Sequence, residues 1–207
     1  MRVEYGALKD LQTYLGALPE AATEAARIAL NDTAEGPGLA VFKKAVVEEA
    51  NFPPGYLTDS RLGVTKKARN ADLAVTITGR FRATSLARFV QNPVLGQKGG
   101  VRVEVKRGQS RTLSSAFLIR LKAGKTLTND NFNLGLAIRL KPGEKLRNTV
   151  GARPIALDKG LYLLYGPSVE QIFRETGPEQ APQVLKLVEQ EFYRQFFRLT
   201  GGKRAAR

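Results

Sequence analysis

The spacing of apolar residues changes twice along this chain of 207 residues, and no other feature constrains the fold as strongly. In LPEAATEAARIALNDTA, residues 18–34, small and apolar residues recur every three or four positions, as on one face of an α-helix. From about residue 62 apolar and polar residues alternate, which is typical of a strand with one buried face. The helical period returns after residue 165. This order of helices, strands and helices predicts an α+β fold.

The N-terminal segment, residues 1–60, is expected to be helical. EGPG at 35–38 breaks or bends the helix, LAVFKKAVVEEA resumes it, and Phe52-Pro53-Pro54-Gly55 ends it. In the C-terminal segment, 166–200, Ser168 is expected to cap a short helix, with Gln171 reaching back in a capping box. A second, longer helix is expected after TGPE, with an apolar stripe of Leu185, Val188, Phe192, Phe196 and Leu199. Residues 201–207 are expected to form a loose basic tail.

Residues 61–165 are expected to form a central antiparallel sheet. The predicted strands are LAVTIT (73–78), VRVEVKR (101–107), SAFLIRLK (115–122), LGLAIRL (134–140) and LYLLY (161–165). Long polar loops are expected at QNPVLGQKGG (91–100), RGQSRTLSS (107–115) and AGKTLTNDNFN (123–133), and a short helical turn at SLARFV (85–90). No repeat or second domain is evident, so residues 1–207 are expected to form one domain.

The positive charge is concentrated in the same central segment. The whole chain has a net charge of +14, and residues 61–160 hold 21 Lys and Arg against 5 Asp and Glu. Such a segment is attracted to an anionic partner, which could be nucleic acid, an acidic protein or a membrane surface.

The residue inventory removes several kinds of chemistry. The chain has no cysteine and no histidine, which excludes disulfides, thiol catalysis and the usual metal ligands and general bases. GQKGG (96–100) lacks the spacing of a phosphate-binding loop. Lys and Arg residues surround the five carboxylates of this segment and make them poor proton carriers; these are Asp72, Glu104, Asp130, Glu144 and Asp158. We therefore expect no enzyme activity, no metal and no cofactor.

The basic segment offers one candidate binding surface, formed by Arg80, Arg82, Arg102, Lys106, Arg107 and Arg111. Phe81 and Phe89 lie among these cations, where they would either stack on the bases of a single strand or belong to the core or an interface. No apolar leader follows Met1-Arg2 and no run is long enough to span a bilayer, so we expect a soluble, intracellular protein without a membrane partner.

The order of several motifs resembles the minor tail protein Z family of tailed phages and prophages. These motifs are ALN (29–31), GRFRATSLARF (79–89), GVRVEVKRG (100–108), AFL (116–118) and RPIALDKGLYLLYGPSVEQIF (153–173). The most specific piece is P-I-x-x-L followed by GPSV-x-x-IF, here Pro154-Ile155, Leu157 and Gly166 to Phe173. The EGPG bend and the AGKTLTNDNFN loop do not map onto the family pattern.

The resemblance implies a tail-completion protein of the virion, assembled in the host cytoplasm. Such a protein joins tail to head as a six-fold ring at the neck, around the DNA channel. Its implied partners are further copies of itself, the neighbouring connector, terminator or tube proteins, and the genome DNA. Most of the positive charge is expected to face protein neighbours, because many phosphate contacts would slow DNA ejection, with the segment 107–115 nearest the genome.

A rigid corner is expected to dock the last helix against the sheet, mostly within one subunit but in part against the next. Its residues are Tyr162, Tyr165, Gly166, Pro167, Ser168, Ile172 and Phe173. The alternative function is a stand-alone nucleic-acid-binding module that uses the basic sheet.

Overall fold

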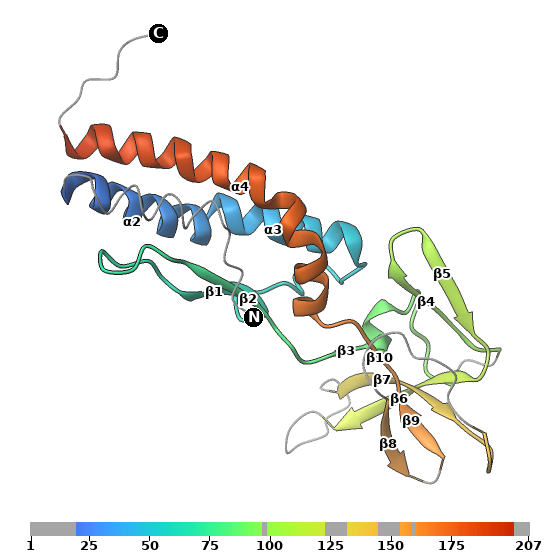
Figure 1. Ribbon diagram of the computed structural model, residues 1–207. Helices are drawn as coiled ribbons and strands as arrows, with labels where there is room; N and C mark the ends of the chain where they lie inside the picture. Colours follow the sequence, from blue (N-terminus) through green and yellow to red (C-terminus); the bar gives the residue numbers. More distant parts are fainter. Residues whose placement is uncertain (1–19, 97–98, 123–131, 145–153, 159, 201–207) are drawn as a thin grey trace. The chain divides into compact units, whose positions relative to one another are not determined.

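The computed structural model describes residues 20–96, 99–122, 132–144, 154–158 and 160–200 (Figure 1). The chain divides into two compact units, each built from segments that are distant in sequence. The helical unit comprises residues within 1–46, 57–80 and 173–207, and the strand unit comprises 47–56 and 81–172. The expectation of a single domain stays a prediction. The α+β class is confirmed, with two N-terminal helices, antiparallel strands and a C-terminal helix.

The helical unit contains α2 (Glu20–Glu35), most of α3 (Pro37–Glu49), β1 (Leu62–Lys66), β2 (Thr76–Gly79) and the larger part of α4 (Val169–Leu199). The break between α2 and α3 falls at Gly36, inside the predicted EGPG bend. The predicted face of α2 is buried, namely Ala22, Ala25, Ala26, Ala29 and Leu30. Helices α2 and α4 run side by side (Figure 1), and Ala26 and Leu30 of α2 pack against Val188 of α4.

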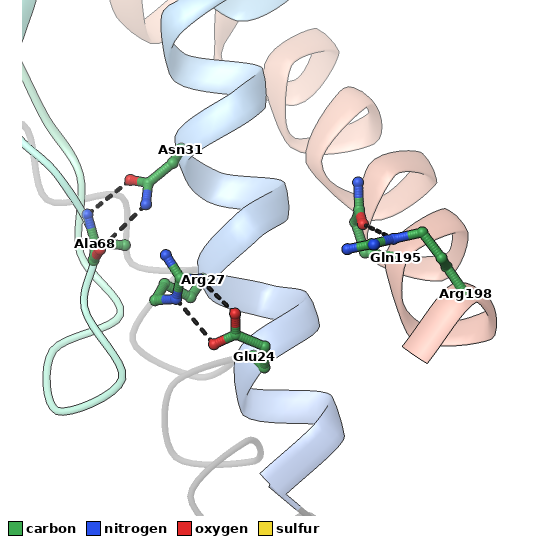
Figure 2. A network of polar contacts seen from close by, with 6 residues as sticks. All are labelled: Glu24, Arg27, Asn31, Ala68, Gln195 and Arg198. Carbon is green, nitrogen blue, oxygen red and sulfur yellow. Dashed lines mark hydrogen bonds and ion pairs between the residues drawn. The ribbon is translucent and has the colours of Figure 1, made fainter. Parts of the chain in front are cut away.

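A polar clamp fixes the loop between β1 and β2 to α2. The Asn31 side chain donates from Nδ2 to the Ala68 carbonyl at 3.1 Å, and the Ala68 amide donates to Asn31 Oδ1 at 2.8 Å (Figure 2). The Asn31 amide thus pairs with one residue's backbone as a neighbouring strand would. Nearby on α2, Arg27 forms an ion pair with Glu24, and on α4 the Arg198 Nε donates to Gln195 Oε1 at 2.8 Å (Figure 2).

Helix α4 is continuous where two helices were expected. It contains Pro178 and Pro182, and its ribbon changes direction along its length (Figure 1). A proline inside a helix lacks the amide donor and bends the axis without necessarily ending the helix. Phe173, before the prolines, meets Phe42 of α3 edge to face at a centroid distance of 5.2 Å. Val188, beyond the prolines, is buried against α2, so both stretches of the helix are held by packing.

The described strands form four small antiparallel sheets in place of one broad sheet, and three of them belong to the strand unit. A four-stranded sheet has the order β6-β7-β9-β8, from β6 (Ala116–Lys122), β7 (Phe132–Arg139), β9 (Leu161–Leu163) and β8 (Ile155–Asp158). A hairpin joins β4 (Val101–Lys106) to β5 (Gln109–Leu113), and β3 (Thr84–Ser85) pairs with β10 (Tyr165–Gly166). The fourth element is the β1–β2 hairpin of the helical unit.

Several local predictions are confirmed and others need correction. The turn at 85–90 is the 3₁₀-helix η1 (Leu86–Phe89), and the strand at 115–122 is β6. The expected loop RGQSRTLSS is wrong, because Gln109–Leu113 is strand β5; its residues are nearly all polar and give no alternating pattern. LYLLY is divided into β9 and β10 at Leu164, and β8 was not anticipated. Most of the expected loop 123–133 lies outside the described residues.

The core of the strand unit lies on one face of the four-stranded sheet. Leu118 of β6 and Leu136 of β7 are opposite each other and pack with Val101 and Val103 of β4 and with Leu164. The alternation predicted for VRVEVK is therefore confirmed, since Val101 and Val103 are buried while Arg102 and Lys106 are exposed.

Candidate functional site: the corner and the basic hairpin

Two candidate surfaces follow from the sequence. The first, called the corner, consists of Tyr162, Tyr165, Gly166, Pro167, Ser168, Ile172 and Phe173. The second, called the basic set, consists of Arg80, Arg82, Arg102, Lys106, Arg107 and Arg111.

Backbone hydrogen bonds join the corner to the segment around β3. Tyr165 is opposite Ser85 and Gly166 is opposite Thr84 in the β3–β10 pair. The Leu86 amide donates to the Leu164 carbonyl at 3.1 Å, and the Thr84 amide donates to the Pro167 carbonyl at 3.4 Å. A two-residue strand pair is weak by itself. These extra bonds extend it on both sides and fix the direction in which the chain enters α4.

The glycine of the corner, Gly166, lies close against an aromatic ring and a leucine side chain. A Cβ at Gly166 would lie 3.1 Å from Phe89 Cε2 and 3.3 Å from Leu86 Cδ1. Phe89 is 2% exposed and its ring centroid lies 5.3 Å from that of Phe52. The corner therefore packs against a buried aromatic cluster.

Ser168 caps α4 as predicted. The Gln171 amide donates to Ser168 Oγ at 3.0 Å, and the Ile172 amide donates to the Ser168 carbonyl at 3.3 Å. This is the forward half of a capping box. The return bond from the Gln171 side chain stays a prediction.

The members of the corner differ in burial. Ser168, Ile172 and Phe173 are buried, whereas Tyr162 and Tyr165 are half-buried. Residues up to Ile172 belong to the strand unit, and Phe173 packs within the helical unit on Phe42. Most of these side chains have packing roles within one chain, while the two tyrosines keep part of their surface open.

The structure does not gather the basic set on one surface. Arg80 belongs to the helical unit and the other five belong to the strand unit, four of them in the β4–β5 hairpin. In that hairpin Arg102 is opposite Thr112, and Arg111 is opposite Val103. Because directly opposed residues share a face, Arg102 and Arg111 lie on opposite faces of the hairpin.

Many cations of the central segment are already paired. Lys66 pairs with Asp72, Lys67 with Glu35 at 2.6 Å, and Lys106 with Glu49 at 2.5 Å. The Arg102 guanidinium donates from Nε and Nη2 to Ser110 Oγ at 2.9 and 2.6 Å, and Arg88 lies 5.2 Å from the centre of the Tyr56 ring. Arg107 and Arg111 are exposed and have no hydrogen bond or ion pair among the described residues. These two cations of the β4–β5 hairpin are therefore available to a partner.

The two phenylalanines proposed for base stacking differ in burial. Phe89 is buried in the aromatic cluster and cannot stack on a nucleobase, so the interpretation as a core residue is the right one for it. Phe81 is 63% exposed and stays available to a partner.

The described residues contain no group of three or more acidic, His or Cys side chains placed to hold a metal ion. A cavity of about 50 Å³ in the helical unit is lined by Leu30, Phe42, Phe173 and other apolar side chains, with Thr33 as its polar member. Binding sites for small molecules usually have volumes of several hundred cubic ångströms, so this cavity has only the size of a packing defect. None of the described helices has the length and apolar content that crossing a membrane requires.

Sequence reasoning missed the exposed apolar residues of β8. Ile155 is 52% exposed and Leu157 is 46% exposed. Their apolar character was visible as part of the P-I-x-x-L motif. Their position at the edge of a sheet depends on strand order, which the local sequence does not contain.

Comparison of the chain with protein-family models, with curated proteins and with solved structures finds no match. The family resemblance therefore stays a prediction from the residue motifs.

Proposed function

We propose that this protein is a structural component of a phage tail, a tail-completion subunit that forms a ring at the head-proximal end and is required for head–tail joining. The observation that carries the proposal is the construction of the corner. Its glycine, its capping serine and its two terminal apolar residues each have a specific packing or hydrogen-bonding role. The cap at Ser168 and the backbone bonds to the segment around β3 give α4 a defined starting point, which the terminal helix of a ring subunit needs.

Other motifs of the resemblance also support the proposal through their structural roles. In ALN, Ala29 and Leu30 are buried in the helical unit and Asn31 clamps the β1–β2 loop. In GRFRATSLARF, Phe89 is the centre of the aromatic cluster under the corner. These residues have packing and hydrogen-bonding roles within the chain, as expected for a protein that functions in assembly.

The distribution of charge fits a subunit beside DNA that must not hold it. Lys66, Lys67 and Lys106 are in ion pairs with carboxylates of the same chain. The affinity of a protein for DNA depends more steeply on salt concentration with each cation that contacts a DNA phosphate. The exposed cations of the β4–β5 hairpin, Arg107 and Arg111, give a weak contact with DNA that salt abolishes. Such a contact lets DNA move through a conduit.

The test is electron microscopy of lysates from the phage that encodes this chain, with the gene silenced and then supplied in trans. The expected result is DNA-filled heads lying beside complete, unattached tails, with joined particles restored by the wild-type gene. A variant with Gln109→Ala, an exposed residue of β5, serves as the control that should restore joining. Normally joined particles in the silenced lysate would overturn the proposal.

A second function, binding of single-stranded nucleic acid, is favoured by one observation. Phe81 is 63% exposed and is followed by Arg82, which is also exposed. An exposed aromatic beside a cation is the usual stacking platform for a base. Phe89, the other proposed platform, is buried and lends no support.

Fluorescence anisotropy with a labelled single-stranded oligonucleotide separates the two functions. The tail-completion proposal predicts weak binding that disappears as salt is raised from about 50 to 200 mM. Binding that persists at the higher salt and falls at least tenfold in Phe81→Ala would favour the nucleic-acid module. Arg111→Glu is the matched variant for a contact made by charge alone.

A further inference from the structure

The four-stranded sheet has two outer strands, and we infer that they join successive copies of this chain: β8 of one copy pairs with β6 of the next. The inference rests on the proposed function, because it assigns the contact between subunits of the ring. In the order β6-β7-β9-β8, each outer strand has one neighbouring strand among the described residues. Backbone donors and acceptors along such an edge are templates for a further strand.

Strand β8 is short and contains a bulge, but its residues 155–157 lack the charged side chains that commonly protect the edge strands of monomers. Ile155, Ala156 and Leu157 are all exposed, and none of them is charged. Monomeric proteins commonly place lysine, a short strand or a covering element at such edges to prevent association. Two large aliphatic side chains, 52% and 46% exposed on one edge strand, indicate a surface that becomes covered on assembly.

The polarity of the sheet is compatible with head-to-tail pairing. Every adjacent pair in the order β6-β7-β9-β8 is antiparallel, so β8 runs opposite to β6. When a second copy is placed in the same orientation beside the first, its β6 is antiparallel to the first copy's β8. The continued sheet then keeps one hydrogen-bonding pattern throughout. A contact between two unlike edges is heterologous, which is the kind that closes into rings.

Side-chain rows also match across this contact. Phe117 of β6, Ala137 of β7, Leu163 of β9 and Ile155 of β8 are opposite one another in turn and form one row across the sheet. They lie on the face away from Leu118 and Leu136, which point into the core. Pairing of copies places Ile155 beside the half-buried residues of the next copy's β6, which are Phe117, Ile119 and Leu121.

This face is already apolar inside the sheet. A Cβ at Gly135 of β7 would lie 2.8 Å from Leu163 Cδ2 and 2.9 Å from Leu121 Cδ1, so these two leucines cover the glycine. The row thus runs from a packed interior to an exposed end at Ile155. Addition of a strand at β8 extends that packing and covers Ile155.

Electrostatics allow this approach despite the net charge of +14. The exposed residues 155–157 are uncharged, and the unpaired cations Arg107 and Arg111 lie on a different element, the β4–β5 hairpin. Residues 155–157 therefore bring no positive charge to the contact between two positively charged copies.

Disulfide trapping tests the pairing cleanly, because the chain contains no cysteine. Full-length chains with Ile155→Cys are mixed with chains carrying one of Phe117→Cys, Ile119→Cys or Leu121→Cys, distinguished by a mass tag, and are oxidised. One of the three mixtures is expected to form the mixed dimer at least tenfold faster than the control mixture with Thr112→Cys, an exposed residue of β5. Same-face positions on a strand recur every two residues, so the fastest mixture also reports the register.

Two results with the purified chain would overturn the inference. The first is a mixed-dimer rate equal to that of the Thr112→Cys control at all three positions. The second is faster dimerisation of Ile155→Cys with itself, which would show like edges pairing. As a further check, Ile155→Lys should weaken self-association by about tenfold while leaving the melting temperature unchanged, because a charge then enters an apolar contact.

Particles separate a failure of this inference from a failure of the proposed function. A chain carrying Ile155→Cys together with the best β6 cysteine should give a ladder of crosslinked products from purified phage. Particles that contain the chain without crosslinks would overturn the edge pairing and leave the neck assignment intact. Particles that lack the chain would overturn the neck assignment, and the purified chain would still decide the pairing.

Discussion

Ser168 shows at the residue scale how one side chain sets the direction of a helix. Its hydroxyl accepts the Gln171 amide at 3.0 Å at the first turn of α4. Replacement by alanine leaves that amide without a partner in a buried position. We expect Ser168→Ala to lower the free energy of unfolding by about 1 kcal/mol in urea titrations. Ser168→Asp retains an acceptor and should stay within a few tenths of the wild type; equal stability of the alanine variant would contradict this account.

Glu191 provides a test of pH dependence. Its carboxylate accepts Arg194 Nε at 2.7 Å and Gln195 Nε2 at 2.6 Å. The hydrogen bonds from Arg194, supported by Gln195, hold the pKa of Glu191 below its usual value although partial burial acts to raise it. A lowered pKa in the folded state contributes stability above the unfolded pKa, and this contribution is lost as the pH falls through the folded pKa.

Glu191→Gln should therefore melt at a lower temperature than the wild type near pH 7, and the difference should shrink as the pH falls below the ordinary glutamate pKa of about 4.3 and through the lowered pKa of the folded state. Thermal melts followed by circular dichroism measure this. Glu189→Gln is the control on the same helix, because Glu189 is exposed and has no ion pair among the described residues. A difference in melting temperature between Glu191→Gln and the wild type that is constant across pH would exclude the ion pair as its cause.

At the scale of elements, the β4–β5 hairpin depends on its turn. Gly108 has a φ of +75° and nothing lies within 4 Å of the position of a Cβ, so any cost of substitution comes from the backbone. We expect Gly108→Ala to destabilise the hairpin by about 1 kcal/mol and to speed amide exchange in Ser110 and Thr112. Gly108→Asn should be milder, since asparagine tolerates the left-handed region. Unchanged exchange in Gly108→Ala would show that the strands hold the turn without glycine.

The same elements show where local sequence suffices for prediction. Strand β4 was predicted because Val101 and Val103 alternate with charged residues and are buried. Strand β5 was missed because QSRTL is polar on both faces, and only pairing with β4 makes it a strand. Helix α4 was expected to break at TGPE. Packing of Phe173 and Val188 on either side of the prolines holds it together.

At the scale of the whole molecule, the two units have separate apolar clusters. Leu136 is fully buried in the strand unit and Leu30 is 4% exposed in the helical unit. Each substitution to alanine should cost about 2–5 kcal/mol. We expect Leu136→Ala to speed amide exchange in the strand unit and Leu30→Ala to speed it in the helical unit, as measured by exchange with mass spectrometry. Equal acceleration in both units by either variant would instead support one cooperative domain.

The sequence by itself determined the α+β class, the interruption at EGPG, the cap at Ser168 and the alternation of β4. Each of these depends on neighbours a few positions away, so a local pattern is enough to reveal it. Only the tertiary structure decided that the basic set is dispersed, because the pairing of β4 with β5 places Arg102 and Arg111 on opposite faces of the hairpin. It also decided that Phe89 is buried while Ile155 lies exposed at a sheet edge. Burial and strand order depend on which segments meet, and an apolar side chain has the same local signature in a core as at an interface.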